Sequence, residues 1–244
     1  MEKWDLSDEL FEHRCKAEHE AYLDSLKPAE RDLLQACDAQ DAAGVRAALA
    51  AGADPDLRTT RYGAPLAVDT LTEGWPEGTA LLLEAGADPL AEDGLLLMEL
   101  CGRGPAELLR RVLRLPGVSA DFDDDAGYNL ADTAAEAGRV DCLRVLHEAG
   151  ADLLANGGRT LCRACDADQP EAVRYLLEEC GADTEAEYDD WCPLFYAVRA
   201  DAPECARLLL EAGADPLHRD IAGETPLKFG GSPAMRRLLD RYIR

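Results

Sequence analysis

The chain has 244 residues, and its acidic composition argues against several classes of function. It contains 49 aspartate and glutamate residues against 25 lysine and arginine residues, which gives a formal net charge of −24. We expect no direct binding of nucleic acid, because contacts with phosphate need clustered basic side chains. No apolar run approaches the roughly 20 residues that span a bilayer, so no membrane partner is expected either. The acidic N-terminus lacks the basic and apolar regions of a signal peptide, which predicts a cytoplasmic protein.

The first 28 residues predict a helix ahead of a separate domain. Leu6, Leu10, Ala17 and Ala21 would lie along one side of a helix that covers residues 4 to about 26. The helix would cover the first of the repeated units described below, because that unit would otherwise expose apolar surface to water. The predicted organisation is therefore a capping helix at 1–28 and a repeat domain at 29–244.

The repeat is visible in a phrase that returns along the chain. Leu-Leu-Leu-Glu-Ala-Gly-Ala-Asp occurs at residues 81–88 and again at 208–215. Related endings recur at intervals of 31 to 34 residues, and their last residues are Asp54, Asp88, Asp121, Asp152, Asp183 and Asp215. A fixed period in this range indicates an array of stacked units rather than one globular core.

Each period predicts two helices separated by a short break. Proline is suited to the first turn of the second helix, where its missing N–H is not needed. The prolines in this place are Pro76, Pro105, Pro170, Pro203 and Pro233. Glycine closes the second helix where a left-handed cap is required, at Gly86, Gly150, Gly181 and Gly213.

Two segments carry a family resemblance. Thr225-Pro226-Leu227 and Cys192-Pro193-Leu194 resemble the Thr-Pro-Leu-His motif that opens an ankyrin repeat, and residues 127–138 are similar to the same segment. The motif histidine is replaced, for example by Cys162 and Phe195. The resemblance implies an all-α ankyrin-repeat solenoid of about seven helix-turn-helix units. The units begin near Glu30, Ala64, Gly94, Tyr128, Arg159, Cys192 and Thr225.

The loops between units, here called fingers, differ in charge. The finger at 121–125 is acidic with one aromatic residue, and the finger at 183–191 carries five acids, two aromatic residues and no base. The resemblance implies that finger tips and the inner face of each first helix bind partners. The candidate residues are Asp123, Asp124, Asp125, Tyr128, Glu185, Glu187, Tyr188, Asp189, Asp190, Trp191, Phe195 and Arg199. The alternative is a solvated acidic loop on which Trp191 packs against its neighbour.

Neither metal binding nor catalysis is predicted. The spacing of a calcium loop is resembled by Asp121, Asp123 and Asp125, followed by Asn129 and Asp132. However, the last two residues belong to a predicted repeat helix. Cys162 and Cys165 have CxxC spacing, yet they lie one turn apart on a repeat helix without a second close pair or clustered histidines. They are predicted to be core thiols. The sequence holds no nucleophile elbow or phosphate-binding loop, so no enzyme and no cofactor is expected.

Charge and resemblance together favour a non-enzymatic protein that binds one basic partner. Our first hypothesis is a cytoplasmic inhibitor of the bacterial immunity-protein type, which neutralises a basic, nucleic-acid-directed toxin through its acidic fingers. It would act as a monomer or in a 1:1 complex. The alternative is a general ankyrin scaffold or adaptor, including a host-directed effector. An enzyme or a metal protein is the third and weakest hypothesis.

Overall fold

The computed structural model describes residues 19–59, 63–124, 127–229 and 231–243. In these residues the regular structure is helical, with isolated β-bridges in place of strands, so the predicted all-α fold is confirmed. The helices are α2 (Pro28–Asp38), α3 (Ala42–Ala50), α4 (Leu66–Thr72), α5 (Pro76–Glu84), α6 (Ala91–Gly102), α7 (Ala106–Val112), α8 (Leu130–Glu136), α9 (Val140–Glu148), α10 (Ala155–Asp166), α11 (Pro170–Glu178), α12 (Pro193–Arg199), α13 (Pro203–Glu211), the 3₁₀ turn η1 (Pro226–Phe229) and α14 (Pro233–Tyr242).

The N-terminal helix is described only from residue 19, and residues 19–25 are helical. The hydroxyl of Tyr22 donates a hydrogen bond of 2.6 Å to the carbonyl of Arg58 in the first finger. Arg31 of α2 donates to the carbonyl of Asp24 at 2.8 Å. Most of the predicted capping helix lies outside the described residues, so the domain boundary at residue 28 stays a prediction.

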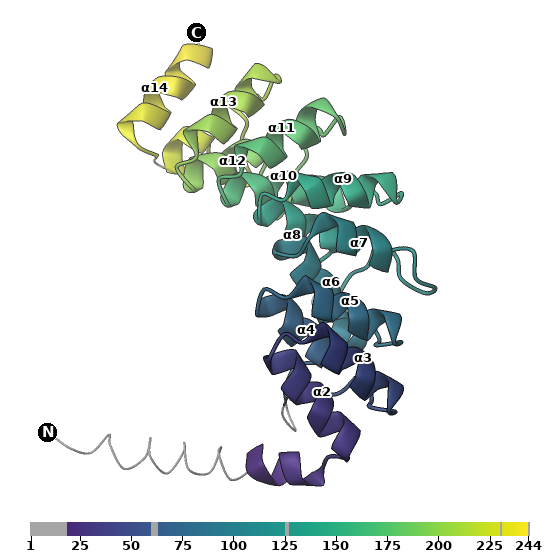
Figure 1. Cartoon of the computed structure of the whole chain (residues 1–244). Coiled ribbons are helices and arrows are strands. Elements are labelled where there is room, and N and C mark those ends of the chain that lie inside the picture. Colours follow the sequence, from purple (N-terminus) through teal and green to yellow (C-terminus); the bar gives the residue numbers. More distant parts are fainter. Residues whose placement is uncertain (1–18, 60–62, 125–126, 230, 244) are drawn as a thin grey trace, which may run out of the picture. The chain divides into compact units, whose positions relative to one another are not determined.

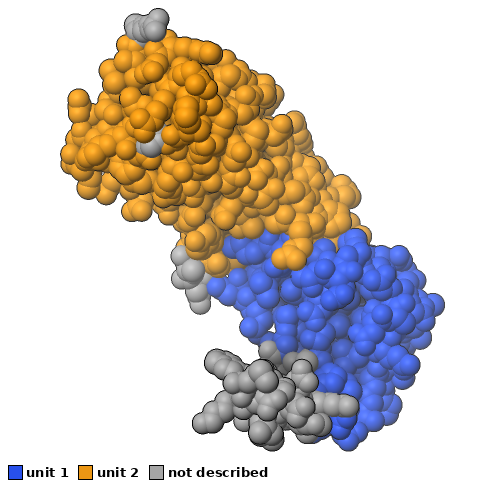
Figure 2. All heavy atoms as spheres, turned by 90° about the vertical axis from the view of Figure 1, so that its left-hand side faces the viewer, with its two compact units in different colours: residues 1–99 blue, residues 100–244 orange. Residues whose placement is uncertain are grey.

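The chain divides into two compact units, residues 1–99 and 100–244 (Figure 2). Unit 1 contains the pairs α2–α3 and α4–α5, and the second helices α3 and α5 pack against each other. Leu33, Val45 and Leu82 are among its fully or almost fully buried side chains. Unit 1 is therefore built from repeated helix pairs, as the period of the sequence predicts.

Unit 2 is a two-layered stack of helices (Figure 1). The first helices α8, α10 and α12 pack in succession and end on η1, while the second helices α7, α9, α11, α13 and α14 form the other layer. Leucines such as Leu143, Leu161 and Leu209 are fully buried between the layers. The core of unit 2 consequently uses mainly small and aliphatic side chains.

The helix boundaries follow the predicted signals with one exception. Pro76, Pro170, Pro203 and Pro233 lie in the first turn of their helices, whereas Pro105 is the residue before α7. The predicted glycine caps are confirmed, because Gly86, Gly150, Gly181 and Gly213 have φ between 71° and 105°.

Two first helices begin later than their outer bounds suggest. Glu92, Asp93 and Gly94 have left-handed backbone angles inside α6, and Gly157 and Gly158 have φ of 65° and 79° inside α10. The regular helices therefore start at about the predicted unit boundaries, Gly94 and Arg159.

Candidate functional site

Aspartate side chains shape the base of most fingers. The carboxylate of Asp54 accepts the N–H of Asp56 at 3.0 Å, and that of Asp183 accepts the N–H of Glu185 at 2.9 Å. Asp88, Asp152 and Asp215 make the same bond to the residue two positions later. These are Asx turns, in which an aspartate binds its own backbone and reverses the chain. The repeated aspartate of the sequence phrase is thus a structural residue.

At the finger of 121–125, the residue that forms the turn lies two positions earlier than the sequence predicted. Gly117 has φ of 85°, like the other cap glycines, and the hydroxyl of Ser119 accepts the N–H of Asp121 at 3.1 Å. Ser119 therefore takes the place of the turn-forming aspartate, and Asp121 is the residue two positions later. The sequence marked Asp121 as the equivalent of Asp88, which is wrong by two residues, because serine can form the same turn with its hydroxyl.

At alternate fingers, a second carboxylate accepts a backbone N–H of the following finger. Asp56 accepts the N–H of Asp88 at 2.7 Å, Asp121 accepts that of Asp152 at 2.8 Å, and Glu185 accepts that of Asp215 at 2.8 Å. In the fingers between, the same position is held by a leucine: Leu90, Leu154 and Leu217. Some of the acidic side chains therefore form hydrogen bonds between neighbouring fingers.

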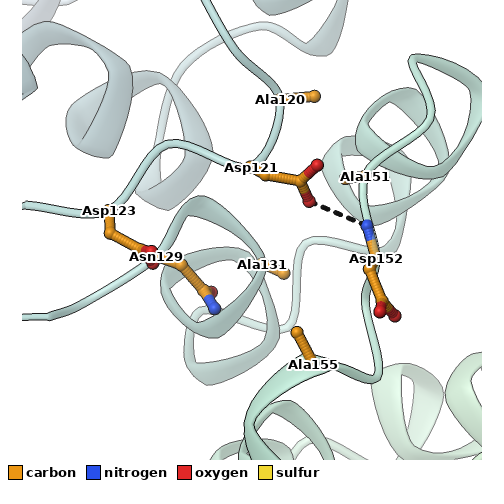
Figure 3. Close-up of a pocket in the computed structure, with 8 residues that line it drawn as sticks. All are labelled: Ala120, Asp121, Asp123, Asn129, Ala131, Ala151, Asp152 and Ala155. Carbon is orange, nitrogen blue, oxygen red and sulfur yellow. Dashed lines mark hydrogen bonds between the residues drawn. The ribbon is translucent and has the colours of Figure 1, made fainter.

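A small hollow of about 120 Å³ lies beside Asp121 and Asp152. Figure 3 shows the bond between these two residues among the side chains that line the hollow. Ala120, Ala131, Ala151 and Ala155 line it with methyl groups. Two residues of the calcium-loop spacing, Asn129 and Asp132, have structural contacts in this region. Asn129 caps α8 by accepting the N–H of Asp132 at 2.7 Å, and Asp132 is fully buried beside Arg159.

Further acids lie at the finger tips. Tyr188 and Trp191 pair across the turn through N–H···O bonds of 3.0 and 3.1 Å. Asp189 and Asp190 form the turn itself with φ of 51° and 65°, and both are exposed. In the finger at 121–125, the N–H of Tyr128 donates to the Asp124 carboxylate at 2.7 Å. Asp189 and Asp190 thus present negative charge at the tip of their hairpin.

Aromatic and arginine side chains alternate beside these tips, across the first layer of unit 2. We define the aromatic–arginine row as Tyr128, Arg159, Arg163, Tyr188, Tyr196, Arg199, Trp191 and Phe229. The guanidinium of Arg159 lies 4.9 Å from the ring centre of Tyr128 and 5.4 Å from that of Tyr188. Arg163 lies 5.0 and 5.9 Å from the same rings. Such distances give attractive cation–π contacts.

The row continues through the finger at 183–191. The rings of Tyr188 and Tyr196 stack at 6.2 Å, and the Tyr196 hydroxyl donates to the Tyr188 carbonyl at 2.9 Å. Arg199 lies 4.9 Å from the Tyr196 ring and 5.2 Å from the Trp191 ring. Trp191 meets Phe229 edge-on at 4.7 Å. Residues from three successive repeats and the last turn are therefore joined by ring and guanidinium contacts, and of these residues Tyr196 is itself buried.

An ion pair with the buried carboxylate of Asp132 holds Arg159 in place within the row. Arg159 Nε lies 2.8 Å from Asp132 Oδ2, although the two atoms are not aligned as a hydrogen bond. The Thr160 hydroxyl donates to Asp132 Oδ1 at 2.9 Å, and Arg159 Nη1 donates to the Gly127 carbonyl at 2.6 Å. Burial raises the pKa of Asp132, and the nearby Arg159 opposes that shift. Arg159 is thus fixed before any partner arrives.

The structure places the predicted site residues in different roles. Asp123, Asp124, Tyr128, Glu187, Tyr188, Asp189, Asp190, Trp191 and Arg199 are exposed or half-buried on or beside the row, and Glu185 fastens two fingers. Asp125 lies outside the described residues. Phe195 is a correction: its side chain is fully buried, with Trp191 stacked above it at 5.7 Å, so it supports the surface and offers no contact to a partner.

Four members of the row were not predicted: Arg159, Arg163, Tyr196 and Phe229. Arg159 and Arg163 are four residues apart on a repeat helix, a spacing that places both on one face. That spacing is the signal that could have found them. Arg199 also forms an ion pair with Asp166 at 2.6 Å, so its guanidinium is held over the aromatic rings.

The cysteines in the described part of the chain behave as predicted. Cys37, Cys101, Cys142, Cys162, Cys165, Cys192 and Cys205 are buried thiols, and Cys180 is half-buried. Burial raises the pKa of Cys37 and Cys205 to about 12. The CxxC pair is part of the hydrophobic core of α10.

None of the described helices has the length and apolarity required to cross a membrane. A family model described as ankyrin repeats (3 copies) matches residues 97–188 and 134–220, a span of just over half the chain. Cortactin-binding protein 2 of Oryctolagus cuniculus is 33% identical over 98 residues, which are 40% of this chain. The ankyrin repeat domain-containing protein SAT10 of Stachybotrys chartarum is 34% identical over 117 residues, or 45% of this chain. Each match covers only 6% of the relative's length.

Two solved structures share the fold. The human ASB11 ankyrin repeat domain superposes with a TM-score of 0.74 at 20% identity, covering 89% of this chain and 98% of that one. The ankyrin repeat domain of Bcl-3 gives a TM-score of 0.67 at 23% identity, covering 86% and 96%. At these identities the likeness concerns the arrangement of helices alone.

Proposed function

Because this chain belongs to the ankyrin-repeat family, whose repeats serve as protein-interaction modules, we propose that unit 2 binds one basic protein and has no enzymatic activity of its own. The observation that carries the proposal is the aromatic–arginine row with acidic finger tips beside it. Tyrosine, tryptophan and arginine are the residues that most often dominate the energy of protein interfaces. Here they come already packed together, so little side-chain entropy would be lost on binding.

The acids and the row have different parts in this proposal. Asp189 and Asp190 at their finger tip, within a chain of net charge −24, attract a basic surface and speed its approach. Tyr128 and Phe229, which are 38% and 37% exposed, contribute contact area at the two ends of the row. Binding should therefore have one component that salt weakens and one that it does not.

The specific form of the proposal is a cytoplasmic inhibitor of a nucleic-acid-directed toxin. An acidic protein seated on a basic cleft blocks the phosphates that the cleft binds, which is the action of an immunity protein. A scaffold or adaptor would leave the partner's activity unchanged. The relatives' name refers to binding of cortactin, but the matched segment is 6% of those proteins, so that partner is not carried over.

The test compares two changes at the finger of 183–191 after affinity capture and mass spectrometry have identified the partner in source cells. Asp189→Asn with Asp190→Gly removes two charges and keeps a favourable turn. We expect it to weaken binding about two- to tenfold at about 0.1 M salt, and less at about 1 M salt. Trp191→Ala should weaken binding by about 30-fold at both salt concentrations, because its contribution is packing.

The matched control is Glu178→Gln with Glu179→Gln, which removes the same charge from exposed residues at the end of α11. Its affinity should equal that of the wild-type chain. Equal affinity of all variants would contradict the proposed surface. Activity of the purified partner, measured with one equivalent of this chain, separates the two forms: inhibition supports the immunity role, and full activity supports a scaffold.

A further inference from the structure

Three side chains able to bind a metal meet where two fingers of unit 2 lie next to each other. Glu185, Cys192 and His218 each offer a ligand atom, and these atoms all lie within 4.8 Å of one another. Glu185 comes from the finger at 183–191, Cys192 immediately precedes α12, and His218 belongs to the following finger. The sequence separates Glu185 from His218 by 33 residues, so only the stacking of repeats unites them.

Both nitrogens of His218 face carboxylates. Nδ1 lies 2.7 Å from Glu185 Oε2, and Nε2 lies 3.1 Å from Glu187 Oε1. A histidine that binds a metal through one nitrogen almost always donates its other N–H to a carboxylate, a backbone carbonyl or water, which fixes the ring and its tautomer. Glu187 is placed to accept the Nε2 proton. That leaves Nδ1 as the nitrogen directed toward Glu185.

The carboxylate of Glu185 is held in position by the backbone. Its Oε1 accepts the N–H of Asp215 at 2.8 Å, so Oε2 is the atom that remains for a ligand bond. The side chain is about one-third exposed, and His218 is 18% exposed. The rings of Phe195 and His218 meet edge to face with 6.2 Å between ring centres, so a buried apolar side chain packs beside the cluster.

Cys192 is the third member of the cluster. Its side chain is fully buried, and it is the N-terminal cap residue of α12. Burial raises the pKa of its thiol to about 11, while the backbone N–H groups of Phe195 and Leu194 lower it in part. A metal ion would replace the thiol proton, and the same N–H groups would then stabilise the thiolate.

We propose that Glu185, Cys192 and His218 form a binding site for one zinc ion, with Glu187 as a positioning residue. The donor set of thiolate, imidazole and carboxylate suits zinc and disfavours calcium and magnesium, which take oxygen ligands. Zinc bonds of about 2.0–2.3 Å put ligand atoms about 3.3–3.6 Å apart in a tetrahedron. Glu185 Oε2 and His218 Nδ1, now 2.7 Å apart, must therefore separate by about 0.6 Å, while the Cys192 sulfur, within 4.8 Å of the other ligand atoms, must come within bonding distance of the ion. Water would complete the fourth position, and the ion would fasten the two fingers together.

The test uses the full chain after treatment with a chelator and titration with Co²⁺, then Zn²⁺. The wild-type chain should bind one Co²⁺ with a near-ultraviolet thiolate-to-cobalt absorption band, and Zn²⁺ should displace it. Zn²⁺ should also raise the thermal unfolding midpoint. We expect His218→Ala and Cys192→Ala to lower zinc affinity more than about 100-fold, and Glu187→Gln to lower it about 10- to 100-fold.

Cys205→Ala is the matched control, because Cys205 is equally buried in α13 and outside the cluster. It should bind metal like the wild-type chain. His218→Ala changes a loop residue, so its circular dichroism should show an intact fold even where Cys192→Ala unfolds. The proposal is overturned if cobalt gives no thiolate band, if zinc binds equally well to His218→Ala, or if no ion binds and His218 serves only as a partner of the two glutamates.

Discussion

Asp189 and Asp190 occupy backbone angles that aspartate does not favour. Their φ values of 51° and 65° complete a two-residue hairpin turn between Tyr188 and Trp191. Turns of this kind prefer Asn-Gly, because a side chain in the left-handed region costs energy. The acidic pair therefore places two negative charges at the tip at some cost in stability.

Replacing the pair by Asn-Gly should stabilise the chain. Asp189→Asn with Asp190→Gly relieves the left-handed strain and the repulsion of neighbouring charges. The greater freedom of glycine in the unfolded chain offsets part of this gain. The expected increase in the free energy of unfolding is about 1 kcal/mol, measured by urea denaturation.

A glycine in ordinary helical backbone gives the control. Asp240→Gly replaces an exposed aspartate inside α14. It should lower the free energy of unfolding by about 0.5–1 kcal/mol, because glycine is a poor helix former. A loss of stability in both variants would show that the turn at Asp189 is not strained.

At the level of elements, the fastening of fingers by carboxylates alternates along the repeats. Asp56, Asp121 and Glu185 each accept the backbone N–H of the turn-forming aspartate in the next finger. Leucine stands at this position in the intervening fingers. The hydrogen bond from one finger to the next is therefore found at alternate fingers, where the residue at this position is acidic.

Removing one of these carboxylates should destabilise the stack. Asp121→Ala leaves the N–H of Asp152 without its 2.8 Å acceptor, and we expect a loss of about 1–2 kcal/mol in urea denaturation. Asp121→Asn keeps an oxygen in the same place and should recover most of the loss. Leu217→Ala, a truncation at the corresponding position of a different finger, should change stability by less than about 0.5 kcal/mol because Leu217 is half exposed. Equal losses for Asn and Ala at residue 121 would contradict a hydrogen-bonding role.

The period of the sequence predicted the helices but not every side-chain contact. Proline and glycine act locally, so Pro203 and Gly213 located a helix start and a helix end correctly. Ser119 was missed because the turn accepts either of two side chains. The contacts of Arg159 with Tyr128 and Tyr188 were not predicted, because these residues come from separate repeats. A local sequence pattern does not indicate which residues of neighbouring repeats will be in contact. Phe195 was placed on the surface wrongly for the same reason.

At the level of the whole chain, the repeat explains the unusual use of cysteine. The layers are thin, so small apolar residues are needed where neighbouring helices approach closely. Cys101, Cys142, Cys165 and Cys205 fill such positions with no exposed surface. Burial raises the pKa of Cys142 to about 11 and holds that of Cys165 well above its usual range.

These thiols should make the chain unfold in alkali. An unfolded thiol ionises near pH 8.5–9, whereas a buried one keeps its proton up to the raised pKa of about 11 or 12. Above about pH 9 the unfolded chain therefore binds fewer protons than the native chain, and the free energy of unfolding falls as pH rises. Each such thiol contributes a slope of about 1.4 kcal/mol per pH unit until its folded pKa is reached.

Cys205→Ala tests this dependence. With a chelator present, the variant should lose about 1.4 kcal/mol per pH unit less than the wild-type chain between about pH 9 and pH 11, because one titrating thiol is gone. The measurement is the urea midpoint at a series of pH values. Val173→Ala is the control, since it truncates an equally buried side chain that does not titrate. It should lower stability by a similar amount at every pH, so its slope should match the wild type. If Cys205→Ala shares the wild-type slope as well, the alkaline loss arises from groups other than the buried thiols.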